Sequence, residues 1–391
     1  MSTISVAQIE SVSSRSQVEG IPWLVWANAI ASMCIATGLY WDISWHEAIG
    51  RDSFWTPAHL LIQFGALLGA AGSGWVILRT TFGRDEDARR NSVQVLGFRG
   101  PLGAFVAAWG GGAMLTSAPF DNWWHEAYGL DVKIISPPHV LLAIGIGGIM
   151  WGGAILCASY MNRADGAERE RLRRMLLCIG GFVVVQTMTL KLEYTNRVLL
   201  HSGISYLVIS MGTLLLLEGL ARVSGHRWAR TIMTGVYSAF VWTLLVVLPL
   251  FPAQPKLGPV YQNITHMVPL PFPILLIVPA FFLDLIWPVF HDAPKWQQAI
   301  FGGVAFTAIL VAVQWPFTTF LMSPAGRSRF LAPPDFPYFA LSSSPTVRHV
   351  FVRWERTAGD FWMDMGLAFL AAVLSMWVGI YWGNWLKKVR R

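Results

Sequence analysis

Residues 41–61 read WDISWHEAIGRDSFWTPAHLL, and residues 120–142 read FDNWWHEAYGLDVKIISPPHVLL. Each stretch contains an Asp, then a His four residues later in a WHEA string, then a Gly, a second Asp and a Pro-rich approach to a second His. The second His follows the first by 13 residues in the first copy and by 14 in the second copy. We interpret this as a duplicated two-helix unit with a period near 79 residues, not as a solenoid array.

The two copies lie among apolar segments of membrane-spanning length. Of the 391 residues, 54% are hydrophobic and only 13% are charged, whereas soluble domains carry about 25% charged residues. About 20 apolar residues in a helix cross a ~30 Å hydrocarbon core, and no alternating barrel strands are evident. The sequence therefore predicts an all-α, polytopic transmembrane bundle of about ten spans, at 22–41, 58–79, 100–118, 138–160, 175–194, 200–221, 230–251, 268–290, 298–321 and 361–386.

Basic residues indicate the orientation of these spans. Arginines are concentrated in the connections after the second, fourth and sixth segments, and the chain ends Lys387-Lys388-Val389-Arg390-Arg391. By the positive-inside rule both termini are cytoplasmic, and connections after odd-numbered segments face outward. The net charge of +7 thus reflects membrane topology and not a nucleic-acid partner. We divide the chain into a cytoplasmic tail (1–21), the duplicated region (22–160), and further spans (161–391) with a long outer loop near 322–360.

The duplicated unit brings three polar side chains together at its outer end. Asp42 and His46 are four residues apart, so they share one face of a helix. Gly50 ends that helix, and Pro57 begins the returning one. His59 then falls in its first turn, next to the end of the first helix. The corresponding residues in the second copy are Asp121, His125, Gly129, Pro137 and His139.

Two imidazoles and one carboxylate suit copper, iron or zinc, and the donor set alone does not choose among them. The sequence predicts one metal site at Asp42, His46 and His59, and another at Asp121, His125 and His139. Acidic residues nearby are candidates to orient the imidazoles: Glu47, Asp52, Glu126 and Asp131. The alternative is that the histidines only tie the loop ends together through hydrogen bonds.

Both triads resemble motifs in a membrane-spanning subunit of the particulate methane and ammonia monooxygenases, the copper membrane monooxygenase family. The family motif Asp-x3-His-x12-His is matched here by Asp42, His46 and His59 in WHEAIGRDSFWTPAH. A second family motif, Asn-x3-His-x13-His ending in Pro-x-His, is matched here by Asp121, His125 and His139. The second match departs from the family pattern because it begins with Asp121 in place of Asn. The resemblance covers about residues 22–160.

The resemblance implies an oxidoreductase component that binds copper, activates dioxygen and oxidises a small apolar substrate entering from the bilayer. The histidines would be neutral ligands, and the two aspartates would stabilise the oxidised ion. Other membrane subunits or an electron donor are implied, because the sequence has no CxxCH, Rossmann fingerprint or Cys cluster of its own. The chain would be an integral membrane protein, in the inner membrane if bacterial, with its metal sites toward the outer or periplasmic face.

Two other hypotheses stay open at this stage. The chain could be a non-catalytic metal-binding or scaffold subunit of a larger membrane complex, or it could bind iron or zinc in place of copper. Whether it is an enzyme is therefore undecided from the sequence. Transport fits less well, because transporters place their ligands near the bilayer midplane. Within the later spans, Asp284 is a candidate for a helix contact or a proton relay. Lys191 is a candidate for an ion pair with Glu193 or for snorkelling to the membrane interface.

Overall fold

The structure is a computed structural model that describes residues 22–50, 54–129, 136–195, 199–256, 264–326, 328, 331 and 355–391. Within these ranges the chain is nearly all-α, as predicted, and its one sheet is an antiparallel hairpin of β1 (Val93–Val95) and β2 (Phe98–Gly100). The α-helices are α1 (Trp23–Ala48), α2 (Pro57–Phe82), α3 (Glu86–Arg90), α4 (Leu102–Tyr128), α5 (Pro137–Met161), α6 (Gly166–Thr189), α7 (Gly203–Ser224), α8 (Ala229–Val247), α9 (Ile277–Phe290), α10 (Lys295–Leu321) and α12 (Ala358–Leu386). Four 3-10 turns accompany them: η1 (Leu192–Tyr194), η2 (Leu199–His201), η3 (Leu248–Leu250) and η4 (Pro324–Gly326).

Eight helices in the described ranges are long and apolar enough to cross a membrane. The other two predicted spans correspond to α4, which has 27 residues but is not among the eight, and α9, which has only 14. Large apolar side chains on these helices face outward, for example Leu67, Ile144 and Leu374, which are 56%, 64% and 55% exposed. A lipid-facing surface explains this exposure, because an apolar side chain needs no burial inside protein when its solvent is hydrocarbon.

The predicted span 268–290 is only partly helical, and this prediction was wrong for its first half. Helix α9 begins at Ile277, and residues 267–273 have no helical structure. Proline stands at every second position, as Pro269, Pro271 and Pro273. A proline ring removes a backbone donor and disfavours helical geometry in the preceding residue, so this spacing excludes a helix. The segment is nevertheless largely buried, with Val268 only 3% exposed.

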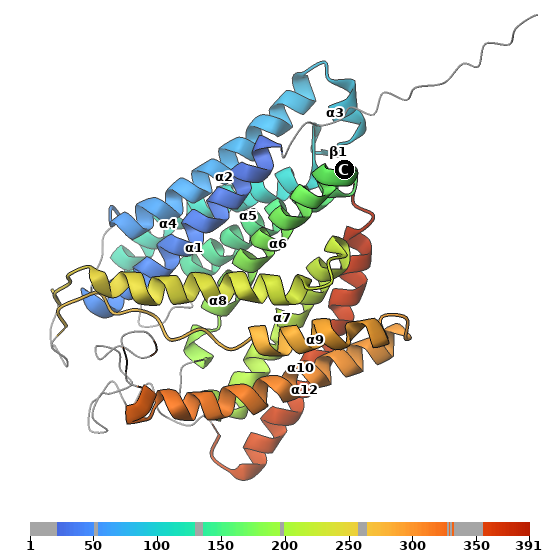
Figure 1. The fold of residues 1–391 in the computed structure, drawn as a ribbon. Helices are drawn as coiled ribbons and strands as arrows, with labels where there is room; N and C mark the ends of the chain where they lie inside the picture. The colour runs from blue at the N-terminus through green and yellow to red at the C-terminus, as the bar shows by residue number, and fades with distance from the viewer. Residues whose placement is uncertain are drawn as a thin grey trace, which may run out of the picture.

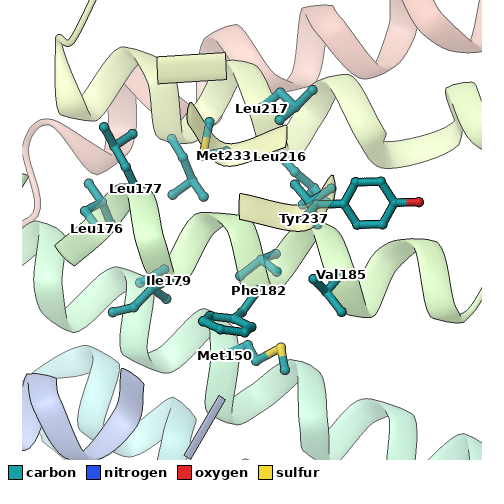
Figure 2. Close-up of a cluster of buried hydrophobic side chains, with 14 of the residues drawn as sticks. Met150, Leu176, Leu177, Ile179, Phe182, Val185, Leu216, Leu217, Met233 and Tyr237 are labelled. Atoms are coloured by element: carbon teal, nitrogen blue, oxygen red, sulfur yellow. The ribbon is translucent and has the colours of Figure 1, made fainter. Parts of the chain in front are cut away.

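The helices pack in sequence-adjacent pairs and then in larger groups (Figure 1). α1 packs on α2, and α4 packs on α5; contacts of α2 with α4 and of α1 with α5 join the two pairs into a four-helix group. α6 links this group to the rest of the chain through α7 and α8, and α12 packs against α7 and α10. The apolar core between α5, α6, α7 and α8 includes Met150, Ile179, Leu217 and Met233 (Figure 2).

Glycines set the register of both helix pairs. A Cβ atom on Gly65 of α2 would lie 2.8 Å from the carbonyl oxygen of Ala31 in α1. A Cβ atom on Gly145 of α5 would lie 2.7 Å from the carbonyl oxygen of Gly110 in α4. Ala31 and Gly110 are separated by the same 79 residues that separate the WHEA strings. The two pairs therefore pack in equivalent registers, each through a backbone contact that admits no side chain.

Helix α7 is interrupted at Met211 and Gly212, where the backbone leaves the helical conformation and Gly212 has φ +77°. The Lys191 ammonium donates hydrogen bonds to the carbonyl oxygens of Ile209 (3.0 Å) and Met211 (2.6 Å) and to the hydroxyl of Thr213 (2.9 Å). Lys191 thus satisfies the acceptors that the break exposes, which is how non-helical backbone is tolerated at membrane depth.

A second buried polar cluster joins α7, α8 and α9. Arg230 is 3% exposed and donates to Asp284 (2.8 Å) and to Glu218 (3.1 Å from Nε), both of which are fully buried. Arg222 also pairs with Glu218, and the backbone and hydroxyl of Thr231 donate to Asp284 at 2.8 Å each. The charge pattern alone assigns Arg222 and Arg230 to a cytoplasmic connection. The structure instead gives Arg230 an acidic partner on each of two helices, and Asp284 a structural helix contact.

Replacing Gly65 with Ala is expected to lower the stability of the α1–α2 pair by roughly 1–3 kcal/mol, because the added methyl group overlaps backbone atoms of α1. The matched control is Gly74→Ala on the same helix, where an added Cβ meets nothing within 4 Å. That control is expected to be neutral or to stabilise by up to about 1 kcal/mol. Thermal unfolding of both variants in the same detergent measures the difference, and equal effects would contradict the close backbone contact.

Replacing Arg230 with Met is expected to destabilise the protein by about 3–5 kcal/mol, because Asp284 would remain buried without a cation and Glu218 would keep only Arg222. Arg227→Met is the control, since Arg227 is exposed and only three residues away. Its effect should stay within about 0.5 kcal/mol. Thermal unfolding measures both changes. A stable Arg230→Met protein would show that the cluster contributes little to the fold.

Candidate metal sites

The first triad is assembled where α1 ends and α2 begins, and we call Asp42, His46 and His59 site 1. Nε2 of His59 lies 3.1 Å from Oδ1 of Asp42, and Nε2 of His46 lies 3.9 Å from Oδ2. Each carboxylate oxygen therefore faces a different imidazole. Two donors bound to one ion at about 2.1 Å, with angles of 90–110°, would be roughly 3.0–3.4 Å apart. The His59 separation lies in this range, and the His46 separation is longer.

The second triad has the same arrangement where α4 ends and α5 begins, and we call Asp121, His125 and His139 site 2. Nε2 of His125 lies 3.5 Å from Oδ2 of Asp121, and Nε2 of His139 lies 3.7 Å from Oδ1. The same oxygen faces the corresponding imidazole in both sites. All six predicted ligand residues are thus brought together in two groups of three, as their spacing predicts.

Local backbone features explain why each chain segment turns at this point. Gly50 follows α1 with φ +97°, and Gly129 follows α4 with φ +86°. An L side chain rarely adopts these angles, so glycine allows the chain to leave each helix here. Pro57 and Pro137 then occupy the first position of α2 and α5, where a missing backbone donor costs nothing.

The two sites lie at the same end of the four-helix group. α1 and α5 are neighbours, since a Cβ on Gly153 would meet Cβ of Asn28 at 3.1 Å. They are antiparallel, because the glycine contacts make each successive pair along α1, α2, α4 and α5 run in opposite directions. Asp42 lies 14 residues after Asn28 and His139 lies 14 residues before Gly153, so the two side chains are at the same level of these antiparallel helices. α2 and α4 are also in contact, through Gly111 and Ala66. Sites 1 and 2 therefore share one face of the protein.

Hydrogen bonds hold the two imidazoles of site 2 from their far sides. Nδ1 of His125 is 3.1 Å from the carbonyl oxygen of Gly129, and Nδ1 of His139 is 2.9 Å from the hydroxyl of Ser136. A carbonyl can only accept, so Nδ1 of His125 carries a proton. In the neutral ring, Nε2 then presents a lone pair toward the Asp121 carboxylate. Two acceptors facing each other repel, and a cation between them would remove that repulsion.

Gly129 and Ser136 were not among the sequence-predicted site residues. The signal that could have found them was present, because a glycine follows WHEA-x in both copies, and a hydroxyl residue precedes the Pro in both, as Thr56 and Ser136. Ser136 begins α5 as its N-cap residue, but its hydroxyl caps no backbone amide and contacts His139 instead.

One carboxylate oxygen in each site faces an imidazole nitrogen but makes no hydrogen bond. Oδ1 of Asp42 and Oδ1 of Asp121 are both buried, and within the described part of the chain neither accepts a hydrogen bond. Burying an unsatisfied charged acceptor is costly, so proteins normally provide a donor or a cation. The same atom is left unsatisfied in both copies. The residues present therefore fit a bound cation in charge and in donor type.

The triads are gathered without being fully arranged around an ion. Among the described residues, no group of three or more His, Cys, Asp or Glu side chains is placed so that one metal ion fits all of them. The imidazoles face the carboxylate oxygens directly, and a shared ion would require them to rotate.

The structure describes two of the four acidic residues predicted to orient the imidazoles. Glu126 is exposed, and its carboxylate accepts a hydrogen bond of 2.8 Å from Asn122. Glu47 is exposed at the last turn of α1, and its carboxylate interacts electrostatically with the His46 imidazole. Asp52 and Asp131 fall outside the described residues. In site 2 the groups observed on the imidazoles are a backbone carbonyl and a hydroxyl.

Site 1 is braced by a segment from the second half of the chain. The hydroxyl of Ser44 in α1 donates to the carbonyl oxygen of Val268 at 2.6 Å. Val268 and the buried Met267 form a small apolar cluster with Ala48 and Leu248. Met267 is thus a packing residue here, and this contact couples the end of α1 to the proline-rich segment.

Comparisons with known proteins give no family assignment. A scan against protein-family models, a search of curated proteins and a search of solved structures each return no match. The observations that bear on function are therefore the geometry of the two sites and the resemblance of their motifs.

The hydrogen bonds predict opposite tautomers for two histidines. His125 is expected to be the Nδ1–H form when neutral, because Nδ1 faces a carbonyl oxygen. His226 is expected to be the Nε2–H form, because its Nδ1 accepts from the backbone N–H of Trp228 at 3.1 Å. Nitrogen NMR of histidine-labelled, metal-free protein measures both forms, with His125→Gln and His226→Gln assigning the signals. An Nε2–H form at His125 would contradict the geometry of site 2.

Proposed function

We propose that the chain is a membrane-embedded, metal-binding oxidoreductase component of the copper membrane monooxygenase type, with one ion at site 1 and one at site 2. The observation that supports this most directly is the buried, unsatisfied Oδ1 atom of the aspartate in both sites. Nε2 of His59 and of His139 is the nearest imidazole nitrogen to that oxygen, at 3.1 and 3.7 Å, and neither makes a hydrogen bond of acceptable geometry to it. The distances of 3.1–3.9 Å between the carboxylate oxygens and imidazole nitrogens give further support.

The side chains of each site have separate roles in this proposal. The imidazoles of His46, His59, His125 and His139 bind through Nε2, and the two aspartates supply the negative charge that favours an oxidised ion. Bound copper would supply the redox chemistry needed to activate dioxygen. In site 2, the Gly129 carbonyl and Ser136 hydroxyl keep the rings in position and increase the basicity of the donor nitrogens. Exposed aromatic side chains next to site 2, Trp123 and Tyr128, offer an apolar approach for a small substrate dissolved in the bilayer.

The membrane arrangement completes the proposal. We propose ten spans, with α4 and the α9 region added to the eight apolar helices, and both termini in the cytoplasm. The shared face of the two sites is then the outer or periplasmic face, and the α1–α2 and α4–α5 pairs are copies of one unit. Equivalent glycine registers in the two pairs support that duplication. Electrons must come from a donor or a partner protein, because the chain has no haem-attachment or nucleotide-binding motif of its own.

A second candidate function is a non-catalytic scaffold subunit in which the triads serve as structural ties. The direct Asp–His contacts, and the lack of any preformed three-ligand group among the described residues, favour this alternative. Iron or zinc at the same residues is a variant of the metal-binding proposal, because the donor set also suits those ions.

Metal content tests the proposal first. The detergent-purified wild type is expected to hold about two copper ions per chain by mass spectrometry after copper reconstitution. His59→Ala and His139→Ala should each lose about one ion, because each removes one ligand from a different site. His226→Ala, which lies outside both sites, should keep two. A folded wild type without metal would overturn the metal-binding proposal and leave the scaffold function, whereas iron or zinc would change the chemistry and keep the sites.

Activity separates an enzyme from a metal-binding scaffold. Copper-loaded protein in bilayers, supplied with a reductant and dioxygen, is expected to oxidise a short alkane or alkene, and His59→Ala or His139→Ala should reduce the rate at least tenfold. Product is measured by gas chromatography. Full copper occupancy without turnover, also in the presence of the native membrane extract as a source of donors, would contradict the oxidoreductase function.

A further inference from the structure

A basic pocket lies at the end of the helices opposite to sites 1 and 2. It has a volume of about 380 Å³, and five of its lining residues are basic: Arg169, Arg173, Arg222, Lys387 and Arg390. None of the residues that line it is acidic. α5 separates it from His139 by a helix of 25 residues, or roughly 35 Å. The pocket is therefore distinct from the candidate metal sites.

Three parts of the chain that are far apart in sequence form this pocket. Arg169 and Arg173 lie in the first turns of α6, and Arg222 lies in the last turn of α7. Lys387 and Arg390 follow α12. Asn162 fixes this last segment, because its side-chain amide donates to the carbonyl oxygens of Leu386 and Val389 at 2.8 Å each. The positive charges are thus gathered by specific contacts and not by a flexible tail alone.

One guanidinium in the pocket retains an unused donor. Nη1 of Arg173 bonds to Glu170, but its Nε atom is buried and has no acceptor among the described residues. Arg222 is already paired with Glu218, so it lines the pocket but adds little net positive charge to it. Arg173 is likewise paired with Glu170, so the uncompensated positive charge comes from Arg169, Lys387 and Arg390. It outweighs the roughly half negative charge that the last turn of α7 contributes.

We propose that this pocket binds a phosphate-bearing anion. A guanidinium presents parallel N–H groups that match two phosphate oxygens, and several Arg and Lys side chains around an open cavity form a suitable headgroup site. The volume lies within the range of small-molecule sites, about 300–1,000 Å³. The ligand is either an anionic phospholipid headgroup from the leaflet at this end of the helices or a soluble phosphate compound. Both share the same recognition chemistry.

Adjacent residues of the same type give matched controls for a test. Arg174 is 79% exposed, does not line the pocket, and shares the Glu170 partner of Arg173. Lys388 is also exposed and does not line the pocket. The test variant is Arg173→Gln with Lys387→Gln, and the control is Arg174→Gln with Lys388→Gln. Both remove two positive charges from the same region, so a diffuse surface field would affect them equally.

The experiment uses the full chain in detergent with two probes. Native mass spectrometry measures retention of added phosphatidylglycerol against phosphatidylcholine, and calorimetry measures binding of inorganic pyrophosphate. The wild type is expected to bind at least one of the anionic probes, with an affinity that falls at least tenfold in the test variant and less than twofold in the control. Binding of phosphatidylglycerol alone identifies a lipid headgroup as the ligand, and binding of pyrophosphate alone identifies a soluble phosphate.

Two results would overturn the proposal. One is that the wild type binds neither probe, and the other is that test and control variants lose affinity equally. Thermal unfolding of each variant confirms that the protein remains folded, and Asn162→Ala provides a further check, since releasing the Leu386–Val389 segment should also weaken binding. Metal content is expected to be the same in all these variants, so failure of this proposal and failure of the proposed metal function are distinguishable.

Discussion

Direct backbone contact between antiparallel helices is the constraint on which the candidate sites depend. Gly65 and Gly145 let α2 and α5 approach α1 and α4 until backbone atoms meet. That approach fixes how far one helix can slide along its partner, and so it decides which residues are level at the helix ends. Asp42 meets His59, and Asp121 meets His139, because each register is fixed several turns away from the site. Inside a bilayer this matters more than in water, since apolar side chains gain little from choosing one another over lipid.

Much of this arrangement could be predicted from the sequence, because the informative features are local. The Asp-x3-His spacing, the Gly after each helix and the Pro at the start of the next one specify a turn with three polar groups, and the structure places those groups within 4 Å of the aspartate in both copies. What could not be predicted depends on partners distant in sequence. The charge pattern places Arg230 in a basic connection, but its acidic partners Glu218 and Asp284 lie on other helices. The Ser44–Val268 contact likewise joins residues 224 positions apart.

The prediction of a helix over the whole of residues 268–290 was wrong for its first half, because it used the average hydropathy of the segment. Mean apolarity made residues 268–290 resemble a span, but the alternation of Pro269, Pro271 and Pro273 is a stronger constraint than hydropathy. The groups that hold the imidazoles of site 2 could not be predicted from residue identity. His125 is held by the backbone carbonyl of Gly129. Every residue has a backbone carbonyl, so the sequence does not show which one will contact the imidazole.

The buried charges of the second half bear on how the protein enters the membrane. α7 carries Glu218, α8 carries Arg230 and α9 carries Asp284. Arg230 and Asp284 are neutralised only by residues on other helices, whereas Glu218 also pairs with Arg222 of α7 itself. A charged side chain at the centre of an isolated helix costs about 2.5–3.5 kcal/mol during insertion. Helices that insert one at a time would each bear that cost, whereas helices that leave the insertion machinery as a group would not. These three helices are therefore expected to be integrated as one unit, and synthesis of the chain must pass Asp284 in α9 before Arg230 of α8 has both of its acidic partners.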